Sequence, residues 1–153
     1  MSDDRVLSRR NVIAAATGIA GLGGVGYFGA RQMARNGRVN VRIVSGEDVD
    51  GSTIVGSETL FTEQLNPDGS TPDRRFHPDY RQSFSEKTPI TVSQTDHKQL
   101  QQNFDRVVYA LSHSCPNADC SSPQVSRHDF NSVSVGDDVR LLYHSGDSAT
   151  IIP

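Results

Sequence analysis

Lysine is scarce in this sequence: only Lys87 and Lys98 occur among its 15 basic residues, and the others are arginine. Acidic residues dominate after the N-terminal segment. Residues 39–153 contain seven arginines and two lysines against 16 acidic residues, a balance of −7. No basic stripe exists here to neutralise phosphates, so the composition argues against nucleic acid as a partner.

Sulfur-containing residues are also few, with two methionines and two cysteines. A blue-copper site needs a cysteine and two histidines, usually with a methionine, close to the end of the domain. No methionine follows Met33, and both cysteines precede the "VSVGDDV" segment at 133–139. The sequence therefore does not support copper electron transfer.

Charge is absent from Val12 to Ala30, a run of 19 residues rich in alanine and glycine. Within it, "GLGGVG" (21–26) matches the G-x-G-x-x-G fingerprint of a dinucleotide-binding turn. That fingerprint needs a surrounding βαβ unit and further strand–helix alternation. The sequence after residue 50 lacks that alternation, so we interpret the glycines as part of a leader and expect no cofactor.

Basic residues precede this run. Ser8, Arg9 and Arg10 are followed by Asn11 and then by two apolar residues. This pattern resembles the twin-arginine export signal, and a basic region before an apolar one is the layout of a secretory signal. The resemblance implies export by the twin-arginine translocase, with Ser8, Arg9 and Arg10 as the signal residues.

The fate of the leader stays open. At 1.5 Å per residue, the uncharged run extends about 28 Å, close to the bilayer core of about 30 Å. An uncleaved leader would anchor the chain in the membrane through residues 12–30. We therefore expect a signal or membrane anchor at 1–38 and one small domain at 39–153, located outside the cell or on the outer face of the cytoplasmic membrane.

The aspartate-rich, lysine-poor domain is similar to proteins of extremely halophilic archaea. Mutual repulsion of carboxylates keeps such a chain soluble, and molar salt screens that repulsion to a Debye length of about 3 Å. This resemblance implies folding that depends on salt. Ordinary variation in a small acidic domain is the alternative.

The two cysteines, Cys115 and Cys120, are separated by the turn-forming "PNAD". Two close cysteines in an exported chain predict a disulfide, because the turn lets their Cα atoms approach. Cys115 and Cys120 could instead bind metal together with His113 and His128, two thiolates and two imidazoles being enough for tetrahedral zinc. That spacing matches no standard zinc motif, so we expect no metal.

Alternating apolar and polar residues, together with turn signals, predict a mainly β domain, a small sandwich or barrel with one short helix. The N-terminal apolar segment would form a signal or anchor helix. The expected strands are 39–44, 52–62, 89–95 and two or three between 133 and 152. We expect a helix over 96–104, a short helix followed by a strand over 105–112, and a long, mobile polar loop over 64–89.

No nucleophile motif occurs in the sequence. His97 is expected on a solvated helix face, and the "DRRFH" segment at 73–77 as a solvated group of charges. The sequence therefore favours a non-enzymatic binding or structural role at the cell surface, with an unknown surface partner. The alternative is an exported metal-binding or redox protein using His113, Cys115, Cys120 and His128.

Overall fold

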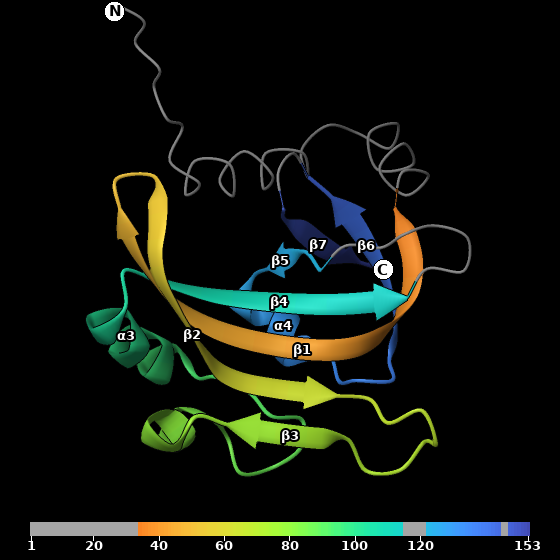
Figure 1. Cartoon of the computed structure of the whole chain (residues 1–153). Helices are drawn as coiled ribbons and strands as arrows, with labels where there is room; N and C mark the ends of the chain where they lie inside the picture. Colours follow the sequence, from red (N-terminus) through yellow and green to blue (C-terminus); the bar gives the residue numbers. More distant parts are fainter. Residues whose placement is uncertain (1–33, 115–121, 145–146) are drawn as a thin grey trace, which may run out of the picture. The chain divides into compact units, whose positions relative to one another are not determined.

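A computed structural model describes residues 34–114, 122–144 and 147–153 (Figure 1). The expected leader, with Ser8, Arg9 and Arg10, and both cysteines lie outside these ranges. The elements in chain order are β1 (Arg35–Asp50), β2 (Thr53–Gln64), β3 (Asp73–Phe76), the 3-10 helix η2 (Pro78–Ser83), α3 (Gln94–Asn103), β4 (Arg106–Ser114), β5 (Gln124–Val125), α4 (Arg127–Ser132), β6 (Asp138–Tyr143) and β7 (Ala149–Ile152).

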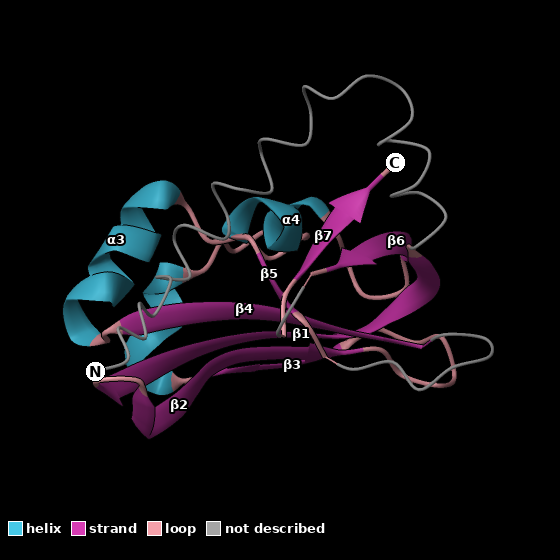
Figure 2. Cartoon of the chain, turned by 90° about the horizontal axis from the view of Figure 1, so that it is seen from above, coloured by secondary structure: helices cyan, strands magenta, loops and turns pink. Residues whose placement is uncertain are grey.

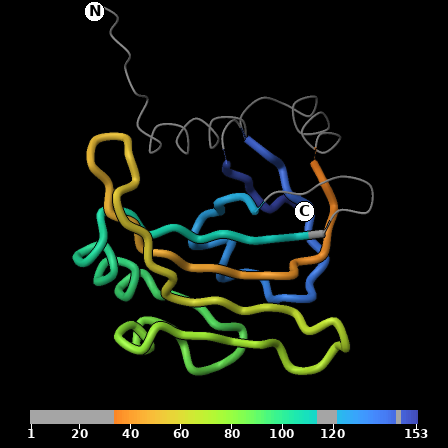
Figure 3. Tube along the Cα trace, in the orientation of Figure 1, coloured from red at the N-terminus to blue at the C-terminus, as the bar shows by residue number. Residues whose placement is uncertain are grey.

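The described part is mainly β, with an antiparallel sheet and few helices, as the sequence predicts. Strands β3, β2, β1, β4 and β5 lie side by side in that order. The first residues of β1 also pair with β6, which pairs with β7. Figure 3 shows the long β1 curving from its hairpin with β2 to its pairing with β6.

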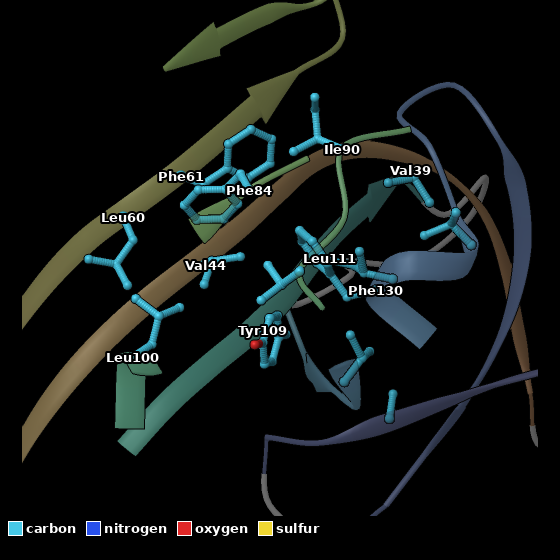
Figure 4. Close-up of a cluster of buried hydrophobic side chains, with 14 of the residues drawn as sticks. Val39, Val44, Leu60, Phe61, Phe84, Ile90, Leu100, Tyr109, Leu111 and Phe130 are labelled. Carbon is cyan, nitrogen blue, oxygen red and sulfur yellow. The ribbon is translucent and has the colours of Figure 1, made fainter. Parts of the chain in front are cut away.

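Helices α3 and α4 lie on one face of the sheet (Figure 2). Leu100 of α3 and Phe130 of α4 are buried in the core against the sheet residues Val44 and Tyr109 (Figure 4). The Phe130 and Tyr109 rings are 5.3 Å apart. Burial of these large apolar side chains supplies the main stabilisation of the fold.

The expected strand at 89–95 is wrong. Ile90 and Val92 are buried, but α3 already begins at Gln94, after the N-cap Ser93. The backbone amide of Val92 donates to Asn131 Oδ1 at 2.9 Å, and its carbonyl accepts from Asn131 Nδ2 at 2.9 Å. An α4 side chain therefore satisfies the backbone groups that a neighbouring strand would have satisfied.

The expected helix at the start of 105–112 is also wrong. Helix α3 ends at Asn103, and Phe104 has an extended backbone with φ −132°. The following residues pair with β1 from Arg106 onward. The β-branched pair Val107 and Val108 favours the strand that forms.

The segment 64–89, expected to be irregular, contains β3 and η2 and contributes to the core. Phe76 of β3 and Phe84 after η2 both pack on Phe61, with ring centroids 5.1 Å apart in each case. Helix α4 is not among the elements that the sequence predicts. Two strands between 133 and 152 are confirmed as β6 and β7, and the turn before β6 contains Gly136 at φ +93°.

Candidate functional site: the open face of the sheet

The two faces of the sheet differ in what covers them. Residues opposite one another in a ladder share a face. Val44, Phe61 and Tyr109 are such partners across three strands, and all are buried beneath the helices. One position earlier on β1, Ile43 is opposite Thr62 and Ala110 on the other face. No described helix packs on this second face (Figure 2).

We call this second surface the open face. It is a regular grid of three ladder rows, each crossing β2, β1 and β4. Its side chains are partly or fully exposed, and none is charged or aromatic. The rows are Gln64, Val41 and Ser112; Thr62, Ile43 and Ala110; and Thr59, Ser45 and Val108.

Charged residues continue this side of the sheet beyond the nine residues of the open face, and they form ion pairs with one another. Glu47 and Arg106 occupy the next ladder position and form an ion pair, with Arg106 Nε 2.7 Å from Glu47 Oε2. On β3, Arg75 Nε lies 3.3 Å from Asp73 Oδ2. This side of the sheet therefore has an uncharged centre, the open face, bordered by two ion pairs whose charges cancel.

The hairpin between β1 and β2 carries two more exposed apolar residues. Ile54 is 50% exposed and Val55 is 64% exposed. Val49 is opposite Ile54, whereas Asp48 is opposite Gly56, so Val55 is an extra residue in a β-bulge. Ile54 shares the register of the open face and extends its apolar character along the hairpin.

In β1, the side chains that are buried are not the ones that its sequence pattern predicts, and we call this strand inverted. Simple alternation over "VNVRIV" would bury Val41 and Ile43 and expose Arg42. Arg42 is instead fully buried, whereas Val41 and Ile43 are on the open face. The ladder between β1 and β4 is irregular between Val39 and Val41, which lets Val39 and Arg42 share the inner face.

The buried Arg42 is held by a polar network in the core. Its Nη1 donates to Glu63 Oε1 at 3.1 Å, and its Nη2 donates to the carbonyls of Ile90 and Phe130 at 2.7 and 2.9 Å. Arg74 Nε donates to the other oxygen of Glu63 at 2.5 Å. Part of the "DRRFH" segment is therefore not the solvated group of charges that was expected.

Burial lowers the pKa of the Arg42 guanidinium, and Glu63 beside it opposes that shift. The side chains of Arg42 and Glu63 are 0% and 2% exposed. A substrate cannot reach such groups. The network therefore joins β1 and β2 to the loop at 84–93 and to α4, and it is a structural feature rather than a catalytic site.

A second polar contact joins α3 to β4. His97 Nδ1 lies 2.7 Å from Tyr109 Oη, so the expectation of a solvated His97 is wrong. Burial lowers the pKa of His97, with Arg127 adding to the effect, and burial also raises the pKa of Tyr109. With both groups neutral, the Tyr109 hydroxyl can donate a hydrogen bond to His97 Nδ1, and the contact holds the ring of His97 against the strand.

The sequence-predicted metal ligands are only partly described. His113 is buried on the inner face of β4, with Nε2 3.3 Å from Tyr143 Oη, and burial lowers its pKa. His128 is exposed on α4. Cys115 and Cys120 lie outside the described residues, so both the disulfide and the metal alternative stay predictions. Within the described ranges, no group of three or more histidine, cysteine, aspartate or glutamate residues could hold a metal ion.

The open face is thus the candidate functional site among the described residues. No family model matches this chain, and neither does any curated protein or solved structure. Among the helices of the described residues, none is long and apolar enough to cross a membrane. The function must therefore be inferred from the molecule itself.

The alternation in "VNVRIV" predicted the strand correctly but not which of its faces is buried. The signal that could have identified the open face is the pair Arg42 and Glu63. Each is a charged residue inside a β pattern, at ladder positions that become neighbours when β1 and β2 pair. Complementary charges at opposite positions are a register signal that can override apolar alternation.

Proposed function

We propose that this chain is an exported or membrane-anchored small β-domain with a non-enzymatic binding role at the cell surface, and that the open face is its contact surface. The observation that carries the proposal is the inverted β1, in which Val41 and Ile43 are outside while Arg42 is inside. Export rests on Ser8, Arg9 and Arg10 before the uncharged run.

The energetics of β1 support a contact role for the open face. A buried arginine–glutamate pair is seldom more stabilising than apolar residues of similar volume, because both charges lose hydration. Burying the apolar residues and exposing the arginine would be the simpler arrangement for stability alone. Val41 and Ile43 are instead partly exposed, and the nearby Ile54 and Val55 are exposed, so apolar surface is available for binding on this acidic domain.

The side chains of the open face limit the classes of partner that could bind there. The grid contains no aromatic ring to stack on a sugar or a base. The two arginines on the same face of the sheet, Arg75 and Arg106, are each paired with a carboxylate, so they add no net positive charge that would attract phosphate or an anionic lipid surface. A neutral grid of β-branched and small polar side chains is suited to a protein surface of similar character.

We also propose that half of the sheet is a small barrel. Strand β4 pairs with β5, and β6 pairs with both β1 and β7. A parallel bridge between Gln124 and Ser148 links β5 to the residue before β7. This cycle of pairings through β1 supports a barrel rather than two stacked sheets.

Photo-crosslinking on intact cells tests the binding role. A photoreactive residue placed at Thr62, on the open face, should give a crosslinked adduct at the cell surface. The matched control carries the same residue at Gln101, which is exposed on α3 on the opposite side of the sheet. Absence of an adduct at Thr62, or equal adducts at both positions, would contradict the proposal.

A further inference from the structure

Both ring nitrogens of His77 are bonded to neighbouring groups. His77 is the N-cap residue of η2, and the backbone amide of Asp79 donates to its Nδ1 at 3.2 Å. On the other side of the ring, Nε2 lies 2.6 Å from Glu58 Oε1 of β2. A backbone N–H can only donate and an ionised carboxylate can only accept, so Nδ1 carries no proton and Nε2 carries one. The contacts therefore fix the neutral Nε2–H tautomer of His77.

We propose that His77 is a pH-sensitive cap of η2, which opens when Nδ1 takes up a proton. A protonated imidazole donates from both nitrogens, so its Nδ1–H would point at the N–H of Asp79 and could not accept from it. Pro78 has no amide hydrogen, which makes the Asp79 amide the first N–H of η2. Protonation of Nδ1 therefore removes the N-cap of this helix.

Glu58 allows this change to stay local. Its carboxylate accepts from Nε2–H in both charge states of the ring, and it attracts an imidazolium more strongly than a neutral imidazole. The side chains of His77 and Glu58 are 24% and 45% exposed, so water can reach the pair and supply the proton. The folded domain can therefore hold a charged His77 at the cost of the cap alone.

The other charged side chains of η2 and β3 are engaged elsewhere. On η2, the Arg81 guanidinium carbon lies 4.0 Å from the centroid of the Phe76 ring, and Asp79 and Tyr80 are the remaining titratable groups. On β3, the arginines that precede His77 are bonded to carboxylates, as Arg74–Glu63 and Arg75–Asp73. Glu58 is thus the charged group that bonds the ring of His77 in the described part of the chain.

The first turn of η2 holds an aromatic contact that the cap supports. The ring of Tyr80 lies 5.2 Å from the His77 ring and 5.4 Å from the Phe104 ring. Phe104 packs on Gly46 of β1, which is the ladder partner of Glu58. Opening of the cap should therefore loosen the contact between η2 and the β1–β2 hairpin. Because η2 contributes no residue to the open face, this effect does not depend on the proposed binding role.

Nitrogen-15 NMR of the exported wild-type chain tests the tautomer and the cap. At about pH 7.5 the His77 ring should carry a proton on Nε2 and none on Nδ1. As the pH falls to about 5.5, Nδ1 should become protonated, and the amide proton of Asp79 should move upfield in the same step because it loses its hydrogen bond. A ring protonated on Nδ1 in the neutral state would overturn the proposal, and so would an Asp79 amide that stays constant while His77 titrates.

Two substitutions separate the roles of the two ring nitrogens. His77→Asn places an amide oxygen where Nδ1 lies and keeps a cap that does not titrate, so its Asp79 amide signal should stay constant from about pH 7.5 to about pH 5.5. His77→Gln keeps an N–H donor within reach of Glu58 but removes the cap, so at about pH 7.5 its Asp79 amide should already resemble that of wild type at about pH 5.5. His128→Gln, at an exposed position on α4, is the control and should titrate as wild type does. An Asp79 amide that moves with pH in His77→Asn as it does in wild type would overturn the proposal.

Discussion

At the scale of single residues, the fold depends on a charge in the core. Arg42 is surrounded by Glu63, two backbone carbonyls and the ring of Phe130, whose centroid is 4.2 Å from the guanidinium carbon. Its Nε is buried and has no hydrogen-bond partner. The hydration that Arg42 loses is therefore replaced mainly through its two terminal nitrogens, which makes Glu63 important for stability.

Removing Glu63 should be strongly destabilising. Glu63→Ala leaves the buried Arg42 without its counter-ion, and we expect a loss of about 3–5 kcal/mol in the free energy of unfolding. The matched control is Asp73→Ala, which removes an exposed ion pair with Arg75 and should cost less than about 1 kcal/mol. Chemical denaturation of the two variants measures the difference. Equal losses would show that the buried network contributes no more than a surface pair.

The contact between His97 and Tyr109 predicts a pH dependence. The pKa of His97 is lowered in the folded state, so the unfolded chain binds its proton at a higher pH. The contribution of His97 to stability should be constant above about pH 6.5, the ordinary pKa of histidine, and should fall as the pH drops below it. The buried His113, whose pKa is also lowered, contributes in the same direction.

His97→Gln isolates the contribution of His97. The amide oxygen can still accept a hydrogen bond from the Tyr109 hydroxyl but does not titrate. The fall in denaturation midpoint between about pH 7.5 and about pH 5.5 should therefore be smaller than in wild type. His128→Gln, at an exposed position on α4, is the control and should keep the wild-type slope. An unchanged slope in His97→Gln would rule out His97 as a source of the pH dependence.

At the scale of elements, sequence patterns predicted where several strands and one helix lie better than they predicted what these elements contact. The strand expected at 39–44 lies inside β1, the strand expected at 52–62 overlaps β2, and the helix expected at 96–104 overlaps α3. The helix begins two residues earlier than expected, because Ser93 Oγ caps it by accepting a hydrogen bond from the backbone amide of Asp96 at 3.0 Å. Local signals define such elements, so they are visible in one sequence.

What the sequence could not predict was decided by contacts between distant segments. The segment containing Val92 has a strand-like composition, but its backbone bonds to the Asn131 side chain instead of a strand. The open face forms only when β2, β1 and β4 pair in the observed register, so no single strand sequence reveals it. The inverted β1 depends on Glu63, 21 residues further along the chain. Tertiary contacts of this kind override local propensity.

The ring of Phe104 packs directly on the backbone of Gly46 in β1, and this close contact gives a prediction. A Cβ atom added to Gly46 would lie 2.6 Å from Phe104 Cδ1, and closer still to two other ring atoms. Gly46→Ala should therefore cost about 1–3 kcal/mol, because a core aromatic ring must move. Gly56→Ala, also in the hairpin, is the control, since its nearest contact would be 3.4 Å from Asp48 Oδ2. Thermal denaturation compares them, and similar midpoints would contradict the close packing of Phe104 on β1.

At the scale of the whole molecule, net charge should control stability. Residues 39–153 carry a balance of −7. Lowering the salt concentration from about 1 M to tens of millimolar lengthens the Debye length several-fold and restores repulsion between carboxylates. The thermal midpoint should fall as salt is removed. A midpoint that is constant or rises on dilution would contradict the resemblance to halophilic proteins.

The central claim of a binding domain outside the cell depends on export, and the twin-arginine pair tests it most directly. Replacing Arg9 and Arg10 together by lysine keeps the charge but removes the guanidinium geometry, and the two side chains are not interchangeable at shaped sites. Fractionation of cells should find the wild-type chain outside the cytoplasm, in the medium or with the membrane. The double variant should accumulate in the cytoplasm, and export of the variant at the wild-type level would contradict the account.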